Sequence, residues 1–154
     1  MNKFAIRLSA GLLVPALFAA WAAGVSQLSG EEREVRSLQI VCAKCHNLQI
    51  VMDTPKSYDA WQESVQKMVN LGAKGTDAQY DDIMDYLHRT ITTIDVNSAD
   101  ADELEIVLNA SETVAQAIVA RRQIKRFTGL ADLKSISGVD ASIVNKKARL
   151  IFFN

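Results

Sequence analysis

The chain has 154 residues, of which 49% are hydrophobic, and its formal net charge at pH 7 is −1. This length suits one domain or two small ones. The balanced charge excludes the overall polybasic or strongly acidic character of proteins that bind nucleic acids or membrane surfaces through bulk charge. The chain has two cysteines and two histidines, and three of these four residues fall within five positions.

Residues 1–23 have the pattern of a secretory signal. Lys3 and Arg7 supply the positive start, an apolar run follows, and Ala-Trp-Ala at residues 20–22 forms a small-x-small cleavage site. An uncleaved anchor stays open as an alternative, because residues 8–30 carry no charged side chain. In either case we expect the rest of the chain to be exported. With cleavage we predict a periplasmic protein that has no membrane span.

The segment Cys42-Ala43-Lys44-Cys45-His46 has the C-x-x-C-H spacing of covalent haem attachment. Two thiols on one helical turn can form thioether bonds to the two vinyl groups of one porphyrin. The histidine beside the second thiol then supplies an axial nitrogen to the iron. We therefore expect one haem c attached at Cys42 and Cys45, with His46 as the proximal iron ligand.

Three other uses of this cysteine pair stay open on the residues alone. A thioredoxin-like redox pair needs a βαβ setting, and no strand-like alternation precedes the motif. A zinc site would have His88 as its remaining nitrogen ligand, and the chain has no second C-x-x-C. A structural disulfide at this spacing would close too small a loop to stabilise the fold much.

Hydrophobic spacing predicts that residues 31–90 form a unit of three helices. The first helix leads into the C-x-x-C-H motif, and residues 47–56 are expected to be a loop ending at a proline. The second helix follows a capping serine and ends at a glycine, over residues 57–72. The third begins with a capping-box pattern and covers residues 76–90. Its acidic residues, between positions 77 and 85, are interpreted as a solvated face.

Four residues of this unit are candidates for a second axial ligand: Met52, Met68, Met84 and His88. Met52 lies in the loop that is expected to fold over the haem. His88 is interpreted as an exposed histidine at a helix C-terminus, favoured there by the helix dipole rather than by iron. If none of the four binds, the iron has an open site for a small gas. Three helices bury little apolar surface alone, so a porphyrin would supply much of the interior.

The stretch from residue 61 to residue 87 resembles small class I cytochromes c of bacterial periplasmic dehydrogenase systems. The matching residues are Trp61, Met68, Gly72-Ala73 and Tyr86-Leu87. The resemblance implies that Met68 is the distal iron ligand in a haem that also binds His46.

After residue 93 the chain resembles a second family. The matching residues are Val96-Asn97-Ser98-Ala99, Glu103-Leu104, Ala115 with Ile118, Arg121-Arg122, Phe127, Asp132-Leu133 and Ile136-Ser137-Gly138-Val139. On these residues, 93–154 is similar to the tandem helix-hairpin-helix domain of the ComEA-like competence and DNA-binding family. The two resemblances together imply an all-α chain, with a cytochrome unit followed by two helical hairpins that pack on each other.

The hairpin loops depart from the Gly-hydrophobic-Gly pattern of this family, in which backbone N–H groups approach a DNA phosphate. Residues 109–111 read Asn-Ala-Ser, and residues 138–140 read Gly-Val-Asp. From residue 92 onward, eight basic residues balance eight acidic ones, whereas a DNA-binding domain is usually basic. We therefore interpret the module as a docking domain with doubtful DNA binding, and the basic residues of 121–126 as a solvated helix end.

These patterns predict a periplasmic monohaem c-type cytochrome that exchanges electrons with another periplasmic redox protein. No paired carboxylates, nucleophile–base pair or phosphate loop indicates an enzyme. Two alternatives remain. One is an envelope DNA-binding protein of the competence type that carries a haem. The other is a haem-based sensor, in which the hairpin module relays a change of iron ligand.

Overall fold

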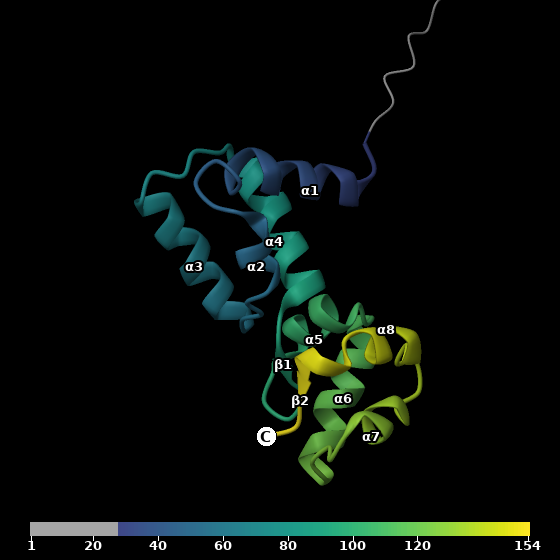
Figure 1. The fold of residues 1–154 in the computed structure, drawn as a ribbon. Helices are drawn as coiled ribbons and strands as arrows, with labels where there is room; N and C mark the ends of the chain where they lie inside the picture. Colours follow the sequence, from purple (N-terminus) through teal and green to yellow (C-terminus); the bar gives the residue numbers. More distant parts are fainter. Residues whose placement is uncertain (1–27) are drawn as a thin grey trace, which may run out of the picture.

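In a computed structural model of the protein, the described residues are 28–154, and they are mostly helical. The predicted signal and its cleavage site lie outside the described residues. Figure 1 shows two groups of helices that meet where α4 runs down into the C-terminal part. We call residues 28–91 the N-terminal unit and residues 94–154 the C-terminal unit. Within the described residues, no helix has the length and apolarity needed to cross a membrane.

The N-terminal unit contains four helices: α1 (Gly30–Val41), α2 (Leu48–Met52), α3 (Tyr58–Asn70) and α4 (Asp77–Ile91). The long helix α4 packs along α1 and also contacts α3. The buried hydrophobic residues of the unit form one cluster: Leu38, Val41, Trp61, Ile83, Leu87 and Ile91.

Helix α2 corrects the prediction of a loop over residues 47–56 and of a three-helix unit. Asn47 begins this helix, because its side-chain oxygen accepts a hydrogen bond of 2.8 Å from the backbone N–H of Gln49. Apolar side chains of the short helix, including Leu48 and Val51, pack against the core of the unit.

The ends of α3 and α4 follow the sequence signals. Gly72 follows Leu71, the residue that ends α3, and has a φ of +101°, a backbone conformation that favours glycine. Thr76 and Gln79 form the predicted capping box at the start of α4. In it the N–H of Thr76 donates to the Gln79 side chain at 2.9 Å, and the N–H of Gln79 donates to the Thr76 hydroxyl at 3.3 Å.

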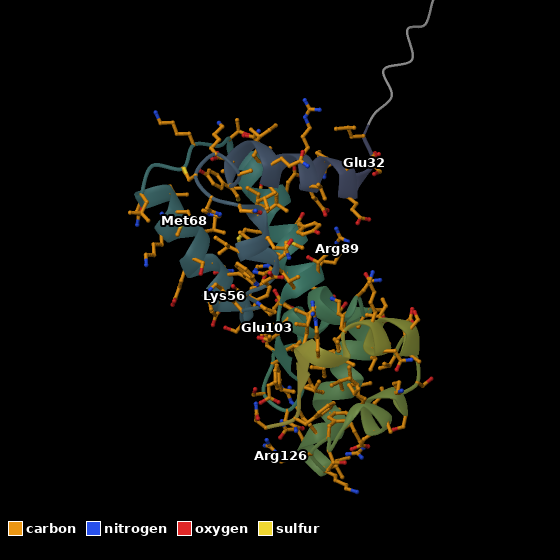
Figure 2. All side chains as sticks on the ribbon, in the orientation of Figure 1. Glu32, Lys56, Met68, Arg89, Glu103 and Arg126 are labelled. Atoms are coloured by element: carbon orange, nitrogen blue, oxygen red, sulfur yellow. The ribbon has the colours of Figure 1, made fainter. Side chains whose placement is uncertain are left out.

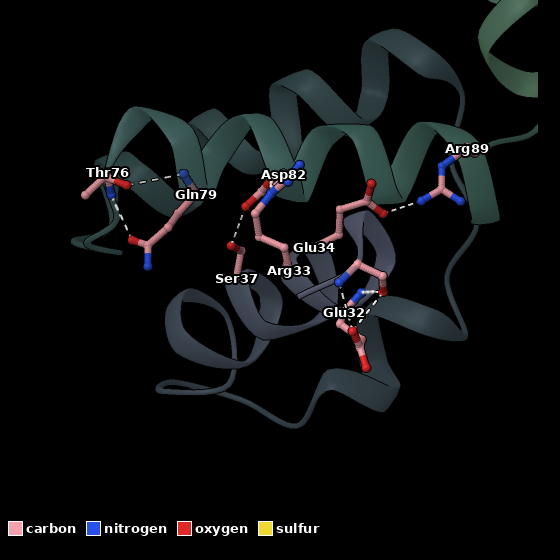
Figure 3. Close-up of polar contacts among 9 residues, drawn as sticks. Glu32, Arg33, Glu34, Ser37, Thr76, Gln79, Asp82 and Arg89 are labelled. Atoms are coloured by element: carbon pink, nitrogen blue, oxygen red, sulfur yellow. Dashed lines mark hydrogen bonds and ion pairs between the residues drawn. The ribbon is translucent and has the colours of Figure 1, made fainter. Parts of the chain in front are cut away.

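The interpretation of the acidic residues of α4 as a solvated face holds for Asp77, Asp81 and Asp85, which are exposed, but not for Asp82, which is buried against α1. Asp82 is 8% exposed and accepts hydrogen bonds from Arg33 (2.8 Å) and Ser37 (2.9 Å). The hydrogen bond from Arg33, helped by Ser37 and opposed by burial, holds the pKa of Asp82 below its usual value. Farther along, Arg89 of α4 pairs with Glu34 of α1, and Figure 3 shows both contacts joining the two helices.

The C-terminal unit contains two helical hairpins, as predicted. The first is α5 (Ala101–Leu108) with α6 (Glu112–Ile124), and the second is α7 (Leu130–Lys134) with α8 (Ala141–Lys146). Its core is a larger buried cluster: Ile94, Val96, Ala99, Leu104, Val107, Leu108, Val114, Ala115, Ile118, Phe127, Leu133, Val144 and Ile151.

The chain is mostly helical, in agreement with the all-α prediction, and two very short strands close this unit. β1 (Ile94–Asp95) enters the unit, and β2 (Ile151–Phe152) follows a turn of 3₁₀ helix over Ala148–Leu150. The two strands are parallel, with Ile94 opposite Ile151. The first and last parts of the C-terminal unit therefore lie side by side.

The connection between the units is two residues long, and both residues make hydrogen bonds. The hydroxyl of Thr92, which is 1% exposed, donates to the carbonyl of Leu87 at 3.0 Å. The N–H of Thr93 donates to the carbonyl of Lys56 at 2.8 Å, so the connection also pairs with the segment before α3. The link is thus part of the folded structure.

Lys147 makes a further contact across this junction. Its buried ammonium donates to the carbonyl of Arg89, near the end of α4, and to the carbonyl of Val107, near the end of α5. The last carbonyls of a helix have no partner within the helix, so Lys147 satisfies acceptors from both units. Burial, together with the positive charges of Arg89 and Lys146, lowers the pKa of Lys147 to about 8.

Candidate cofactor site

The N-terminal unit surrounds a cavity of about 570 Å³, between the segment that follows α1 and the helices α3 and α4. Pockets for small molecules and cofactors usually measure roughly 300–1,000 Å³ and are mostly apolar. The lining here is mostly apolar as well, and includes Val41, Val51, Val65, Ala73, Ile83 and Leu87.

All four residues that the sequence singles out for haem line this cavity. Cys42, Cys45 and His46 reach it from the turn that follows α1, and Met68 reaches it from α3. In Figure 2, Met68 lies on α3, away from the C-terminal unit. Two thiols, one imidazole and one thioether thus surround a single apolar space, although Met68 is 22 residues or more from the motif in sequence.

The two cysteines are free thiols on one turn. The N–H of Cys42 donates to the last turn of α1, and the N–H of Cys45 donates to the carbonyl of Cys42 at 3.4 Å. Cys45 is exposed, while burial raises the pKa of the Cys42 thiol. Because the thiolate is the reactive form in disulfide exchange, this environment does not favour a thioredoxin-like role. Among residues 28–154, no three His, Cys, Asp or Glu side chains gather as a metal site.

His46 has a second contact that bears on metal binding. Its Nδ1 atom lies 3.3 Å from the carbonyl oxygen of Asn47. This contact favours the tautomer with the proton on Nδ1, which leaves the lone pair of Nε2 free. Metal-binding histidines commonly donate their other ring N–H to a carbonyl in this manner.

The apolar side chains at and just after the C-terminal end of α3 are incompletely covered by protein. Trp61 at its start is buried, but Met68 is 38% exposed and Leu71, just past the helix, is 72% exposed. Ile50 of α2, which also lines the cavity, is 62% exposed. Leaving large apolar side chains in water forgoes about 25 cal/mol per Å² of burial. These side chains are placed where a bulky apolar ligand would cover them.

One buried polar atom in a residue that lines the cavity lacks a partner. The indole Nε1 of Trp61 is buried and makes no hydrogen bond with the protein. An unsatisfied buried donor costs about 1–3 kcal/mol. The ammonium of Lys56, which also lines the cavity, lies 5.7 Å from the centre of the Trp61 ring. An anionic group on a ligand in the cavity would pair with this ammonium.

The other three candidates for the second iron ligand do not line the cavity. Met52 and Met84 pack against the core of the unit. His88 is 5% exposed, which corrects its interpretation as an exposed helix-end residue. Its ring stacks on Tyr58, with centroids 3.7 Å apart, and burial lowers the pKa of His88. The Tyr58 ring comes from 30 residues earlier, so no local pattern shows that it covers His88.

The loops of the C-terminal hairpins keep a tight backbone turn despite the missing glycines. Asn109 ends α5 with a φ of +50°, so this asparagine adopts the left-handed conformation that otherwise favours glycine. Gly138 has a φ of +89° in the second loop. A Cβ atom at Gly138 would lie 2.6 Å from Val114, so glycine is needed there for close packing as well.

Side chains of the chain itself occupy the helix starts that follow these loops. The carboxylate of Asp140 accepts hydrogen bonds from the N–H groups of Ser142 (2.7 Å) and Ile143 (3.4 Å) at the start of α8. Hydrogen bonds from Ser142 lower the pKa of Asp140, so the carboxylate stays ionised. At the start of α6, the Ser111 hydroxyl accepts from the N–H of Val114 at 3.4 Å.

The order and packing of these two hairpins agree with a comparison of the sequence with family models. Residues 89–151 match a helix-hairpin-helix motif. This match confirms the predicted helix-hairpin-helix character of the C-terminal unit. It begins in the last turns of α4 and ends at the first residue of β2. No significant match was found among curated proteins or among solved structures.

The interpretation of the basic cluster as a solvated helix end is wrong for Arg121 and Arg122, which are engaged within the helix-hairpin-helix unit, whereas Lys125 and Arg126 are exposed. Arg121 pairs with Asp132 at 3.1 Å. Arg122 donates to the carbonyl of Val96 at 2.9 Å, and Arg126 donates to the carbonyl of the last residue. The guanidinium groups of Arg121 and Arg122 hold α6 against α7 and the start of the unit, so these two are less available to phosphate than their sequence suggests.

Proposed function

We propose that the chain is an exported monohaem c-type cytochrome that carries electrons, with the haem c in the cavity of the N-terminal unit. Cys42 and Cys45 would form the two thioether bonds, and His46 and Met68 would be the axial ligands of the iron. The observation that carries the proposal is that these four side chains line one cavity. The electron-transfer partner would be another periplasmic redox protein.

The rest of the cavity fits the same group. A porphyrin is a broad apolar ring that bears two carboxylates. The exposed apolar residues around the cavity would cover the ring. The ammonium of Lys56, which lines the cavity, is suited to a carboxylate, because hydrogen bonds to charged acceptors are the strong ones.

A bound haem supplies one-electron chemistry at its iron. The chain itself would set the conditions for that chemistry. The thioether of Met68 is a ligand type that raises the reduction potential, and the apolar lining limits access of water to the iron. The contact between His46 and the carbonyl of Asn47 orients the imidazole.

The proposal is tested on protein made with a cytochrome c maturation system, by absorption spectra and by the mass of the whole chain. We expect one haem per chain that survives acid extraction. The Met68→Ala variant should lose the methionine–iron charge-transfer band, whereas the matched Met84→Ala variant should keep it. Release of the pigment on extraction, or a mass without a haem adduct, would overturn the proposal. A five-coordinate ferrous spectrum that shifts with carbon monoxide would favour the sensor instead.

For the C-terminal unit we propose a docking role, with DNA binding as the second candidate because of the helix-hairpin-helix match. Asp140 places a carboxylate at the helix start where the family would approach phosphate, and the unit has no excess of basic residues. We therefore expect no gel shift of duplex DNA at low salt. Tight binding that weakens steeply with salt would reverse this order of candidates. The Asp140→Gly variant serves as the comparison, since it removes the carboxylate.

A further inference from the structure

The backbone after Met68 folds back onto the turn of α3 that carries this residue. The N–H of Ala73 donates to the carbonyl of Met68 at 3.0 Å, and the N–H of Gly72 donates to the carbonyl of Val69 at 2.9 Å. The loop over residues 71–75 therefore fixes the backbone of Met68, whose own side chain is 38% exposed.

Tyr80 of α4 holds this loop from the cavity side. Its hydroxyl donates to the carbonyl of Ala73 at 2.9 Å, and its side chain lines the cavity. Ala73 thus bonds to Met68 through its N–H and to Tyr80 through its carbonyl. Tyr80 is connected to the backbone of Met68 through a single residue.

Gly75 extends this connection to the C-x-x-C-H segment. A Cβ atom at Gly75 would lie 3.0 Å from the side chain of Val41 and 3.3 Å from the ring of Tyr80. The Gly75 backbone therefore packs closely against both side chains. Val41 directly precedes Cys42, so this packing links the turn that carries Cys42 and His46 to the loop that follows Met68.

We infer that Tyr80 is a positioning residue for Met68: through the carbonyl of Ala73 it sets the place of the Met68 thioether relative to the His46 side of the cavity. This inference rests on the proposed function. Without the hydroxyl of Tyr80, the loop gains freedom and the Met68 sulfur leaves the iron more readily. A competing ligand then binds more tightly, and the reduction potential falls.

The test is a titration of the ferric holoprotein with imidazole, which competes with methionine for the iron. In Tyr80→Phe the ring stays and one hydrogen bond is lost, so we expect imidazole to bind about five- to tenfold more tightly than in the wild type. The matched control is Tyr86→Phe, because Tyr86 lies on the same helix and does not line the cavity. This control should stay within about twofold of the wild type, and its reduction potential should not change.

A second variant, Gly75→Ala, leaves the Tyr80 hydroxyl in place and pushes against the Tyr80 ring and Val41. We expect imidazole to bind more tightly to this variant than to the wild type, as in Tyr80→Phe. If Tyr80→Phe does not load haem, the imidazole affinity of Gly75→Ala tests the positioning role. Equal imidazole affinities in the wild type, Tyr80→Phe and Gly75→Ala would overturn the positioning role and leave the electron-carrier proposal standing. A wild type without methionine ligation would overturn the assignment of Met68 and this inference together.

Discussion

The N-terminal and C-terminal units are similar in length, but they complete their interiors differently. The C-terminal unit buries thirteen hydrophobic residues in one cluster, against six in the N-terminal unit. In the N-terminal unit, Ile50, Met68 and Leu71 stay exposed around a cavity. The comparison teaches that one unit is stabilised by its own side chains, while the other places apolar surface where the polypeptide offers no partner.

Removing the haem attachment should have the largest effect on the difference in stability between the two units. In a variant with Cys42→Ala and Cys45→Ala, the N-terminal unit should lose most of its stability, because a ligand that binds the folded state stabilises it. The C-terminal unit should keep its helices. Thermal melting followed by circular dichroism, with hydrogen exchange to assign each transition, would show this. Identical melting of the variant and the haem-loaded wild type would contradict it.

Truncation of a buried side chain should destabilise the C-terminal unit strongly, whereas truncation of an exposed apolar side chain should hardly affect the N-terminal unit. Phe127 is 1% exposed, so Phe127→Ala should cost about 3–5 kcal/mol of unfolding free energy in the C-terminal unit. Leu71 is 72% exposed, so Leu71→Ala in the haem-free chain should change stability by no more than about 0.5 kcal/mol. Urea denaturation measures both values. A large loss from Leu71→Ala would show that the cavity rim is already packed without a ligand.

The contact of Asp82 with α1 should make the N-terminal unit sensitive to acid. Because the folded state lowers the pKa of Asp82, its stabilisation is complete above the unfolded value of about 4 and is lost as the pH falls through the folded value. Asp82→Asn should therefore be less stable than the wild type at pH 7, and the difference should shrink below pH of about 4. Asp81→Asn, an exposed neighbour, is the control.

The last prediction concerns Lys147 at the junction. Its pKa of about 8 lies below the ordinary 10.5, so between these values the unfolded chain binds more protons and stability rises with pH. The wild type should gain stability relative to Lys147→Met as the pH rises from about 8 to about 10. Urea titrations at several pH values test this. Parallel pH profiles would mean that Lys147 titrates like a solvated lysine.

The features that the sequence predicted well depend on neighbouring residues. The capping box of Thr76 and Gln79 and the terminating Gly72 are local signals, and the structure confirms both. The two hairpins of the C-terminal unit also follow local periodicity and turn residues. The gathering of the cavity residues was a hypothesis from the C-x-x-C-H motif and a resemblance, since nothing local connects Met68 to Cys42.

The features that were missed depend on distant residues or on very short elements. The burial of Asp82 and His88 is due to Arg33 and Tyr58, which lie on other helices. Strands of two residues leave no periodic pattern in a sequence. Helix α2 had a usable signal, because Asn47 precedes a mostly apolar segment, but the helix is only five residues long.

The two-residue link between α4 and β1 has a consequence for encounters with other molecules. Thr92 and Thr93 are both hydrogen-bonded, so the link favours one orientation of the cavity relative to the hairpins. A protein tethered by a loose linker samples many approach angles to its target, whereas this chain would present the same one each time. Binding of the hairpins to a surface would then also fix the direction in which the cavity faces.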